Sequence, residues 1–152
     1  MCCCEWAKKI KWSKVLQAGL IYMVIAFVVR QIEAFLTMSY YTDPQYFGVW
    51  SKIMMPKAGP PPASFTILSL LFSYITGVTI AALYDYIKDL LPKKFWPRVL
   101  NFTDLVIGLM VVFFTLPIYL LLNVPPMLLI WWFISSVVIV FLGTIVFVKM
   151  IK

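Results

Sequence analysis

Four long apolar stretches most constrain how this chain can fold. Each is about 20 residues or longer, which is the length that an α-helix needs to cross a hydrocarbon core of about 30 Å. Hydrophobic residues make up 63% of the 152 residues and charged residues only 12%, so a soluble domain of this size could not bury the apolar surface. The sequence therefore predicts one all-α membrane domain over residues 1–152, with four transmembrane helices in an antiparallel up-down bundle. The expected spans cover about residues 15–38, 64–86, 98–122 and 127–148.

The basic residues predict the orientation of the bundle. They cluster before the first stretch, between the second and third, and at the end of the chain, whereas residues 42–63 and 123–126 contain only Lys52 and Lys57. Because Lys and Arg are enriched in cytoplasmic loops, we expect a protein of the cell membrane with both termini in the cytoplasm. Basic residues at membrane boundaries suit the headgroups of the lipid bilayer, so we expect no nucleic-acid partner.

Two features of composition argue against an enzyme. The chain has no histidine, and its three cysteines are Cys2, Cys3 and Cys4. Common metal sites and Ser–His–Asp or Cys–His catalytic sites therefore cannot be assembled, and we expect no metal, no cofactor and no enzymatic activity. The adjacent thiols, beside a basic and Trp-bearing segment, are either acylated membrane anchors or unmodified.

The charged residues Arg30 and Glu33 interrupt the first apolar stretch. If the helix enters the membrane near Lys14, Arg30 lies about 24 Å along it, at a rise of about 1.5 Å per residue. The two residues share a helix face because they are three positions apart. Two arrangements are open. The side chains reach outward to the far headgroups, which this depth favours, or they form an inward-facing pair that lines a polar pocket.

Residues 42–63 predict a short helix at the membrane interface. Asp43 and Pro44 are typical of a helix start. We expect a helix over residues 44–55 with an aromatic face toward the membrane, followed by an extended, proline-rich connector at residues 58–62. The residues expected to define the face of this interfacial helix are Tyr46, Trp50 and Ile53.

Small residues at intervals of four mark one face of the second stretch. They form a helix-packing stripe, which permits close approach of another helix, either inside the bundle, as we favour, or in a second copy. The stripe consists of Ser69, Ser73, Gly77 and Ala81.

Two aspartates are expected at the cytoplasmic rim. Asp85 is the next step of the stripe, and Asp104 in the third stretch shares a helix face with Gly108. We expect both carboxylates to face inward and to pair with Lys88 or Arg98, because buried carboxylates are seldom left without a partner.

Pro117 predicts an irregularity in the third stretch. Proline has no backbone N–H, so the carbonyl oxygen of Phe113 loses its helical partner. A helix usually bends at such a position.

Tyr46 and Trp50 after the first stretch, and Tyr84 and Asp85 near the end of the second, resemble the plan of small uncharacterised four-span integral membrane proteins of bacteria and archaea. The resemblance covers most of the chain as a pattern, and it implies the four-span fold but no function. Small multidrug transporters also have four spans and a glutamate in the first. Here Glu33 lies late in its helix beside an arginine, and the first loop is far longer.

Three functions are compatible with these features. We favour a non-enzymatic accessory or assembly subunit that docks a larger membrane complex or its own copies in a homo-oligomer. The alternative is a small transporter or ion-conducting oligomer in which Arg30 and Glu33 line the pathway. A third interpretation is a lipid-binding or membrane-organising protein.

Overall fold

A computed structural model describes residues 10–56 and 60–152 of the chain. Within these residues, four helical segments are long and apolar enough to cross a membrane, which confirms the predicted all-α, four-span fold and indicates a multi-pass membrane protein. The predicted cysteine cluster Cys2–Cys4 and residues 57–59 lie outside the described residues. The first span is α2 (Trp12–Leu36), and the second is α4 (Ala63–Ile87), which the 3-10 turn η2 (Lys88–Leu90) continues. The third span consists of α5 (Phe95–Met110), η3 (Val111–Thr115) and α6 (Leu116–Leu121). The fourth span is α7 (Pro126–Met150).

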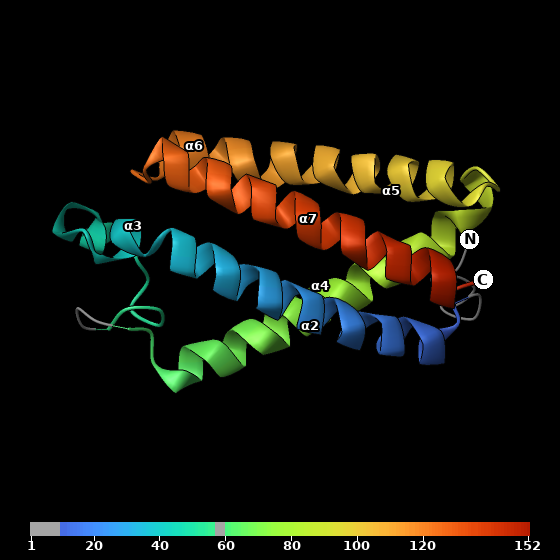
Figure 1. The fold of residues 1–152 in the computed structure, drawn as a ribbon, viewed down its shortest axis with the longest axis horizontal. Helices are drawn as coiled ribbons and strands as arrows, with labels where there is room; N and C mark the ends of the chain where they lie inside the picture. The colour runs from blue at the N-terminus through green and yellow to red at the C-terminus, as the bar shows by residue number, and fades with distance from the viewer. Residues whose placement is uncertain (1–9, 57–59) are drawn as a thin grey trace, which may run out of the picture.

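The helices alternate in direction, so the bundle has two ends (Figure 1). One end carries residues 10–11, the segment 88–94 between α4 and α5, and residues 151–152; we call it the terminal end. The other end carries the segments 37–62 and 122–125, and we call it the loop end.

The helices α2 and α7 form the centre of the bundle. α4 crosses α2, and α5 lies beside α7 (Figure 1). The spans differ in burial over the most apolar 18-residue stretch of each one. The buried share of this stretch is 39% in α7 and 28% in α2, but only 17% in the second span and 6% in the third. The second and third spans are therefore peripheral elements with large outward-facing surfaces.

Two glycines bring α2 and α4 into contact where they cross. A Cβ added to Gly77 would lie 2.8 Å from Cδ1 of Tyr22 and 2.9 Å from the carbonyl oxygen of Gly19. A Cβ added to Gly19 would lie 2.9 Å from the backbone nitrogen of Val78. Larger residues at these two positions would hold the helices apart.

The predicted helix-packing stripe thus has two different parts. Gly77 and Ala81 are buried in the crossing with α2, inside the molecule, whereas Ser69 and Ser73 are half-buried. The latter lie in the loop-end half of α4, which diverges from the other helices in Figure 1.

The buried core is concentrated toward the terminal end. There the ring of Tyr84 packs edge-on against Phe102 of α5, with centroids 5.2 Å apart, and against Phe147 of α7 at 6.4 Å. Val15, Val99 and Ile151 are also fully buried. The helices α4, α5 and α7 therefore meet at this end, and the bundle opens toward the loop end.

The predicted irregularity at Pro117 takes the form of a π-helical turn. This turn, η3, spans Val111–Thr115 and immediately precedes α6. Because Pro117 cannot donate a backbone hydrogen bond to Phe113, a wider turn accommodates the interrupted ladder.

The predicted interfacial helix over residues 44–55 is wrong in extent and type. The structure has a 3-10 helix, η1, at Pro44–Val49, and its start is capped as expected, because the Asp43 side chain accepts from the backbone N–H of Gln45 at 3.0 Å. Trp50 has an extended backbone and leaves the helix. Its ring packs against Tyr41 and Trp132, with centroids 5.1 and 6.3 Å apart, and this tertiary contact explains the early end.

Candidate functional site: a polar cluster between α2 and α7

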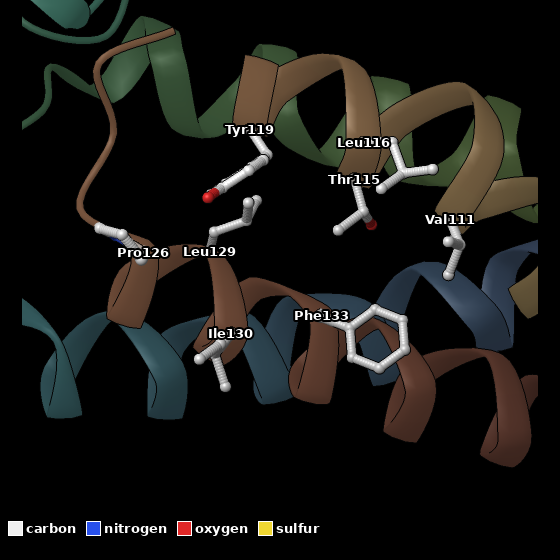
Figure 2. Close-up of a pocket in the computed structure, with 8 residues that line it drawn as sticks. All are labelled: Val111, Thr115, Leu116, Tyr119, Pro126, Leu129, Ile130 and Phe133. Carbon is white, nitrogen blue, oxygen red and sulfur yellow. The ribbon is translucent and has the colours of Figure 1, made fainter.

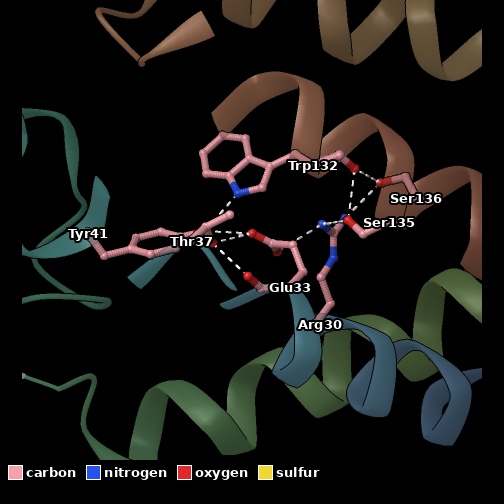
Figure 3. Close-up of polar contacts among 7 residues, drawn as sticks. All are labelled: Arg30, Glu33, Thr37, Tyr41, Trp132, Ser135 and Ser136. Carbon is pink, nitrogen blue, oxygen red and sulfur yellow. Dashed lines mark hydrogen bonds and ion pairs between the residues drawn. The ribbon is translucent and has the colours of Figure 1, made fainter. Parts of the chain in front are cut away.

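Arg30 of α2 is bound to two serines of α7. Its Nη1 donates to Ser135 Oγ and its Nη2 to Ser136 Oγ, both at 2.7 Å (Figure 3). The same Nη1 lies 3.5 Å from Glu33 Oε2. The planar guanidinium group presents several N–H donors in a fixed fork, which suits adjacent acceptors on a neighbouring helix.

Glu33 is the buried member of the pair. Its side chain is 6% exposed, compared with 39% for Arg30. Thr37 Oγ1 lies 2.9 Å from Glu33 Oε1 and 2.7 Å from the backbone oxygen of Glu33, and Tyr41 donates its hydroxyl hydrogen to Oε1 at 3.4 Å. Both carboxylate oxygens thus have polar partners, which a buried carboxylate needs.

Thr37 also shapes the local backbone. It interrupts the helix between α2 and α3 (Met38–Thr42), with φ −111° and ψ 12°. Threonine hydroxyls compete with backbone donors for helical carbonyl groups, and Thr37 does so at Glu33. This break separates α3 from α2, and from α3 Tyr41 reaches the carboxylate.

Trp132 of α7 closes the cluster into a ring. Its indole Nε1 donates to the Tyr41 hydroxyl at 2.7 Å. Its backbone oxygen accepts from Ser135 Oγ at 3.0 Å and from Ser136 Oγ at 2.7 Å. Each serine hydroxyl therefore accepts a hydrogen bond from Arg30 and donates its single hydrogen to the backbone oxygen of Trp132. Both its donor and its acceptor function are thus used.

The Tyr41 hydroxyl remains neutral over the physiological pH range. Burial raises the pKa of Tyr41 to about 12, and the Glu33 carboxylate acts in the same direction, while the hydrogen bond from Trp132 opposes the shift. A neutral phenol can accept from Trp132 and donate to Glu33 at once. The polar link from α7 to Glu33 is therefore maintained.

The favoured expectation that Arg30 and Glu33 reach outward to the headgroups is wrong. The pair turns toward α7, because Ser135 and Ser136 offer two hydroxyl groups within reach of the guanidinium group. The inward-facing arrangement was the alternative, and the pair adopts it through hydrogen bonds with neighbouring side chains. Two pockets elsewhere on the molecule have mainly apolar linings.

One of these pockets lies between the third span and α7 (Figure 2). It has a volume of about 370 Å³, and Tyr119 and Thr115 face Leu129 and Phe133 across it. The π-helical turn and α6 form its upper wall in Figure 2. Such a lining can hold an apolar group such as a lipid tail.

Asp85 behaves largely as its spacing predicts. It is buried, and its Oδ1 forms an ion pair with Lys88 Nζ at 2.9 Å. The sequence does not reveal its second partner: Oδ2 accepts from the backbone N–H of Lys11, 2.7 Å away, at the start of α2. A carboxylate near a helix N-terminus satisfies a free donor and interacts favourably with the helix dipole.

The expectation for Asp104 is wrong. Its side chain is exposed, and no ion pair or hydrogen bond joins it to Lys88, Arg98 or any other described residue. The buried face of α5 carries Val99, Phe102, Thr103 and Val106, and Asp104 lies on the opposite side. Arg98 instead donates from Nε to the backbone oxygen of Pro92 at 2.8 Å.

The predicted interfacial residues have separate environments. Trp50 joins the aromatic contacts at the loop end, Tyr46 is half-buried in η1, and Ile53 is 58% exposed. They do not form one helical face.

Sequence reasoning missed most of the ring around Glu33. The ring joins two segments that lie about a hundred residues apart in the chain: Thr37 and Tyr41 in one, and Trp132 with the two serines in the other. One signal was available: Ser135 and Ser136 are adjacent hydroxyl residues inside an otherwise apolar span. Polar side chains at membrane depth commonly hydrogen-bond across helices.

No protein-family model, curated protein or solved structure matches this chain. The resemblance to small four-span membrane proteins therefore stays a prediction.

Proposed function

We propose that this chain is a non-enzymatic, multi-pass protein of the cell membrane that serves as an accessory or assembly subunit, docking a membrane partner or further copies of itself. The observation that carries the proposal is the unequal burial of the spans. In its most apolar stretch, the third span is only 6% buried, whereas α7 is 39% buried. A span so weakly covered by its own chain offers surface for another transmembrane helix.

The polar cluster supports a structural role for the central helices. Arg30 and Glu33 contact each other and four further residues, and these contacts join α2 and α3 to α7 (Figure 3). A fully satisfied polar network rigidifies the elements that it joins. α2 and α7 would then act as a rigid platform for the peripheral spans.

The sequence supports the non-enzymatic part of the proposal and the orientation. The chain lacks histidine and has cysteines only at residues 2–4. Described basic residues gather at the terminal end, including Lys11, Lys88 and Arg98, whereas Lys52 lies at the loop end. A terminal end in the cytoplasm agrees with the enrichment of basic residues there.

One observation favours the alternative of a transporter or ion-conducting oligomer. Arg30 keeps 39% of its side chain exposed although it lies in a membrane span. Charged residues with such access mark the pathways of many transporters. The test below therefore includes a flux measurement.

Native mass measurement of the protein extracted from its own membrane tests the proposal. We expect a stoichiometric complex that is heavier than one 17.6 kDa chain with bound lipid, and no solute or ion flux from the purified chain in liposomes. The extraction is repeated in two detergents, because a true subunit contact persists in both. A lipid-bound monomer that conducts ions or solutes would contradict the assembly role and establish the alternative.

A further inference from the structure

The outward face of α5 combines a charge with a hollow. Asp104 and Gly108 lie one turn apart on this face, opposite the buried residues of α5. Leu105, Leu109 and Val112 surround them, and together with Phe113 they line a shallow hollow of about 460 Å³. The hollow arises because Gly108 has no side chain, and a Cβ added there would have no neighbour within 4 Å.

Asp104 lies within the third of the four helical segments that are long and apolar enough to cross a membrane. Trp96 is exposed near the start of α5 and suits the membrane boundary at the terminal end. Asp104 follows eight residues later, which is about 12 Å along the helix. Lysine and arginine can extend their charge to the headgroups from such a depth, but aspartate has a short side chain.

No described residue of this chain neutralises Asp104. Two carboxylates of the other spans have a cation beside them: Glu33 has Arg30 and Asp85 has Lys88. Charged residues in transmembrane segments commonly pair with one another or face a polar environment. Asp104 has no such ion pair among the described residues, so its exposed carboxylate is available to a cation of another molecule.

We propose that this face of α5 docks a transmembrane helix of a partner protein, and that the helix carries a lysine or arginine level with Asp104. The inference rests on the proposed function as an assembly subunit. Charge complementarity identifies the partner's chemistry, and Gly108 lets the partner's backbone approach closely. A second copy in the same orientation fits poorly, because a symmetric contact about this face would bring two Asp104 carboxylates together.

A model helix serves as the probe. It is a synthetic leucine- and alanine-rich peptide of about 20 residues with one lysine placed level with Asp104 and a dansyl group at one end. Energy transfer from the protein's tryptophans to dansyl, in phosphatidylcholine vesicles, reports association. We expect the lysine peptide to associate about tenfold more strongly than the same peptide with methionine at that position.

Two variants test the two parts of the site. Asp104→Asn removes the charge, and Gly108→Leu fills the hollow; each is expected to weaken association with the lysine peptide by about tenfold. Thr66→Leu, which adds the same side chain to an exposed position of α4, is the matched control and should change nothing. Far-UV circular dichroism checks that each variant folds, and Asp104→Lys should transfer the preference to a glutamate peptide.

Equal association of the lysine and methionine peptides would overturn the proposal, as would insensitivity to Asp104→Asn. Labelled copies of the chain are also tested for energy transfer to one another. If they show it and Gly108→Leu abolishes it, the face binds a second copy, and the proposal is overturned. The native complex separates this inference from the proposed function. If the complex survives in Asp104→Asn, the subunit role stands and this docking face is wrong; if the wild type forms no complex, the subunit role fails.

Discussion

At the scale of single residues, the charged side chains within the spans have two kinds of surroundings. Arg30 and Glu33 are placed in a ring of hydroxyl, phenol and indole groups that leaves both charges with polar partners. Asp104 lies on an outward face, where no other residue in the described part of the chain pairs with it. The first arrangement joins α2 to α7, and the second is the basis of the proposed contact with a partner helix.

The pair Arg30–Glu33 should be strongly coupled in stability. Arg30→Leu leaves the buried Glu33 carboxylate without its cation, and we expect a loss of about 2–4 kcal/mol, somewhat below the value for a fully buried pair because Arg30 is partly exposed. The double variant with Glu33→Leu should lose less, since Thr37 and both serines keep backbone acceptors. Unfolding in detergent micelles measures both free energies. Additive losses from the two single changes would contradict the coupling.

At the scale of elements, glycine determines how closely the helices approach. Gly77 faces Tyr22 and the backbone of Gly19 at the crossing of α2 and α4, and Gly143 of α7 receives the other side of the Tyr22 ring. Gly108 has open space beside it. The same residue type therefore serves internal packing in α4 and α7 but not in α5.

Replacing Gly77 by alanine should destabilise the protein, whereas replacing Gly108 by alanine should not. Gly77→Ala places a methyl group 2.9 Å from the carbonyl oxygen of Gly19, so the helices must separate, and we expect a loss of about 1–3 kcal/mol. Gly108→Ala meets no atom and should be neutral or stabilising by up to about 1 kcal/mol, because alanine favours the helix. Thermal unfolding in detergent compares the two. Equal losses would contradict the close crossing.

At the scale of the whole molecule, the bundle is closed at the terminal end and open at the loop end. Tyr84, Phe102 and Phe147 pack together at the terminal end. Toward the loop end, the helix α4 diverges and leaves Ile67 and Leu71 exposed. At this end the polar ring joins α2 and α3 to α7, and α6 lies beside α7 (Figure 1).

Orientation can be tested by labelling introduced cysteines. In a background where Cys2–Cys4 are serine, Lys52→Cys should react with a membrane-impermeant maleimide from outside intact cells, whereas Lys93→Cys should react only after permeabilisation. The expectation follows from the accumulation of basic residues at the terminal end. Labelling of Lys52→Cys only after permeabilisation would reverse the proposed orientation.

The sequence by itself determined the features that depend on local chemistry. The four spans follow from apolar length, and the irregularity near Pro117 follows from a missing donor. For Asp85 the sequence offered Lys88 or Arg98, and the partner is Lys88, three residues along the chain. The cap at Asp43 is equally local. Each requires only neighbouring residues, so no knowledge of the packing was needed.

Only the tertiary structure decided which way the polar residues face. In a transmembrane helix apolar side chains cover the lipid-facing and the buried sides alike, so hydrophobicity does not distinguish the inward face. Arg30 turns inward because α7 presents two serines at its level, and Trp50 leaves its helix because Tyr41 and Trp132 receive its ring. Asp104 faces outward because the opposite side of α5 packs in the core. These directions depend on contacts between distant segments, which the order of residues along the chain does not specify.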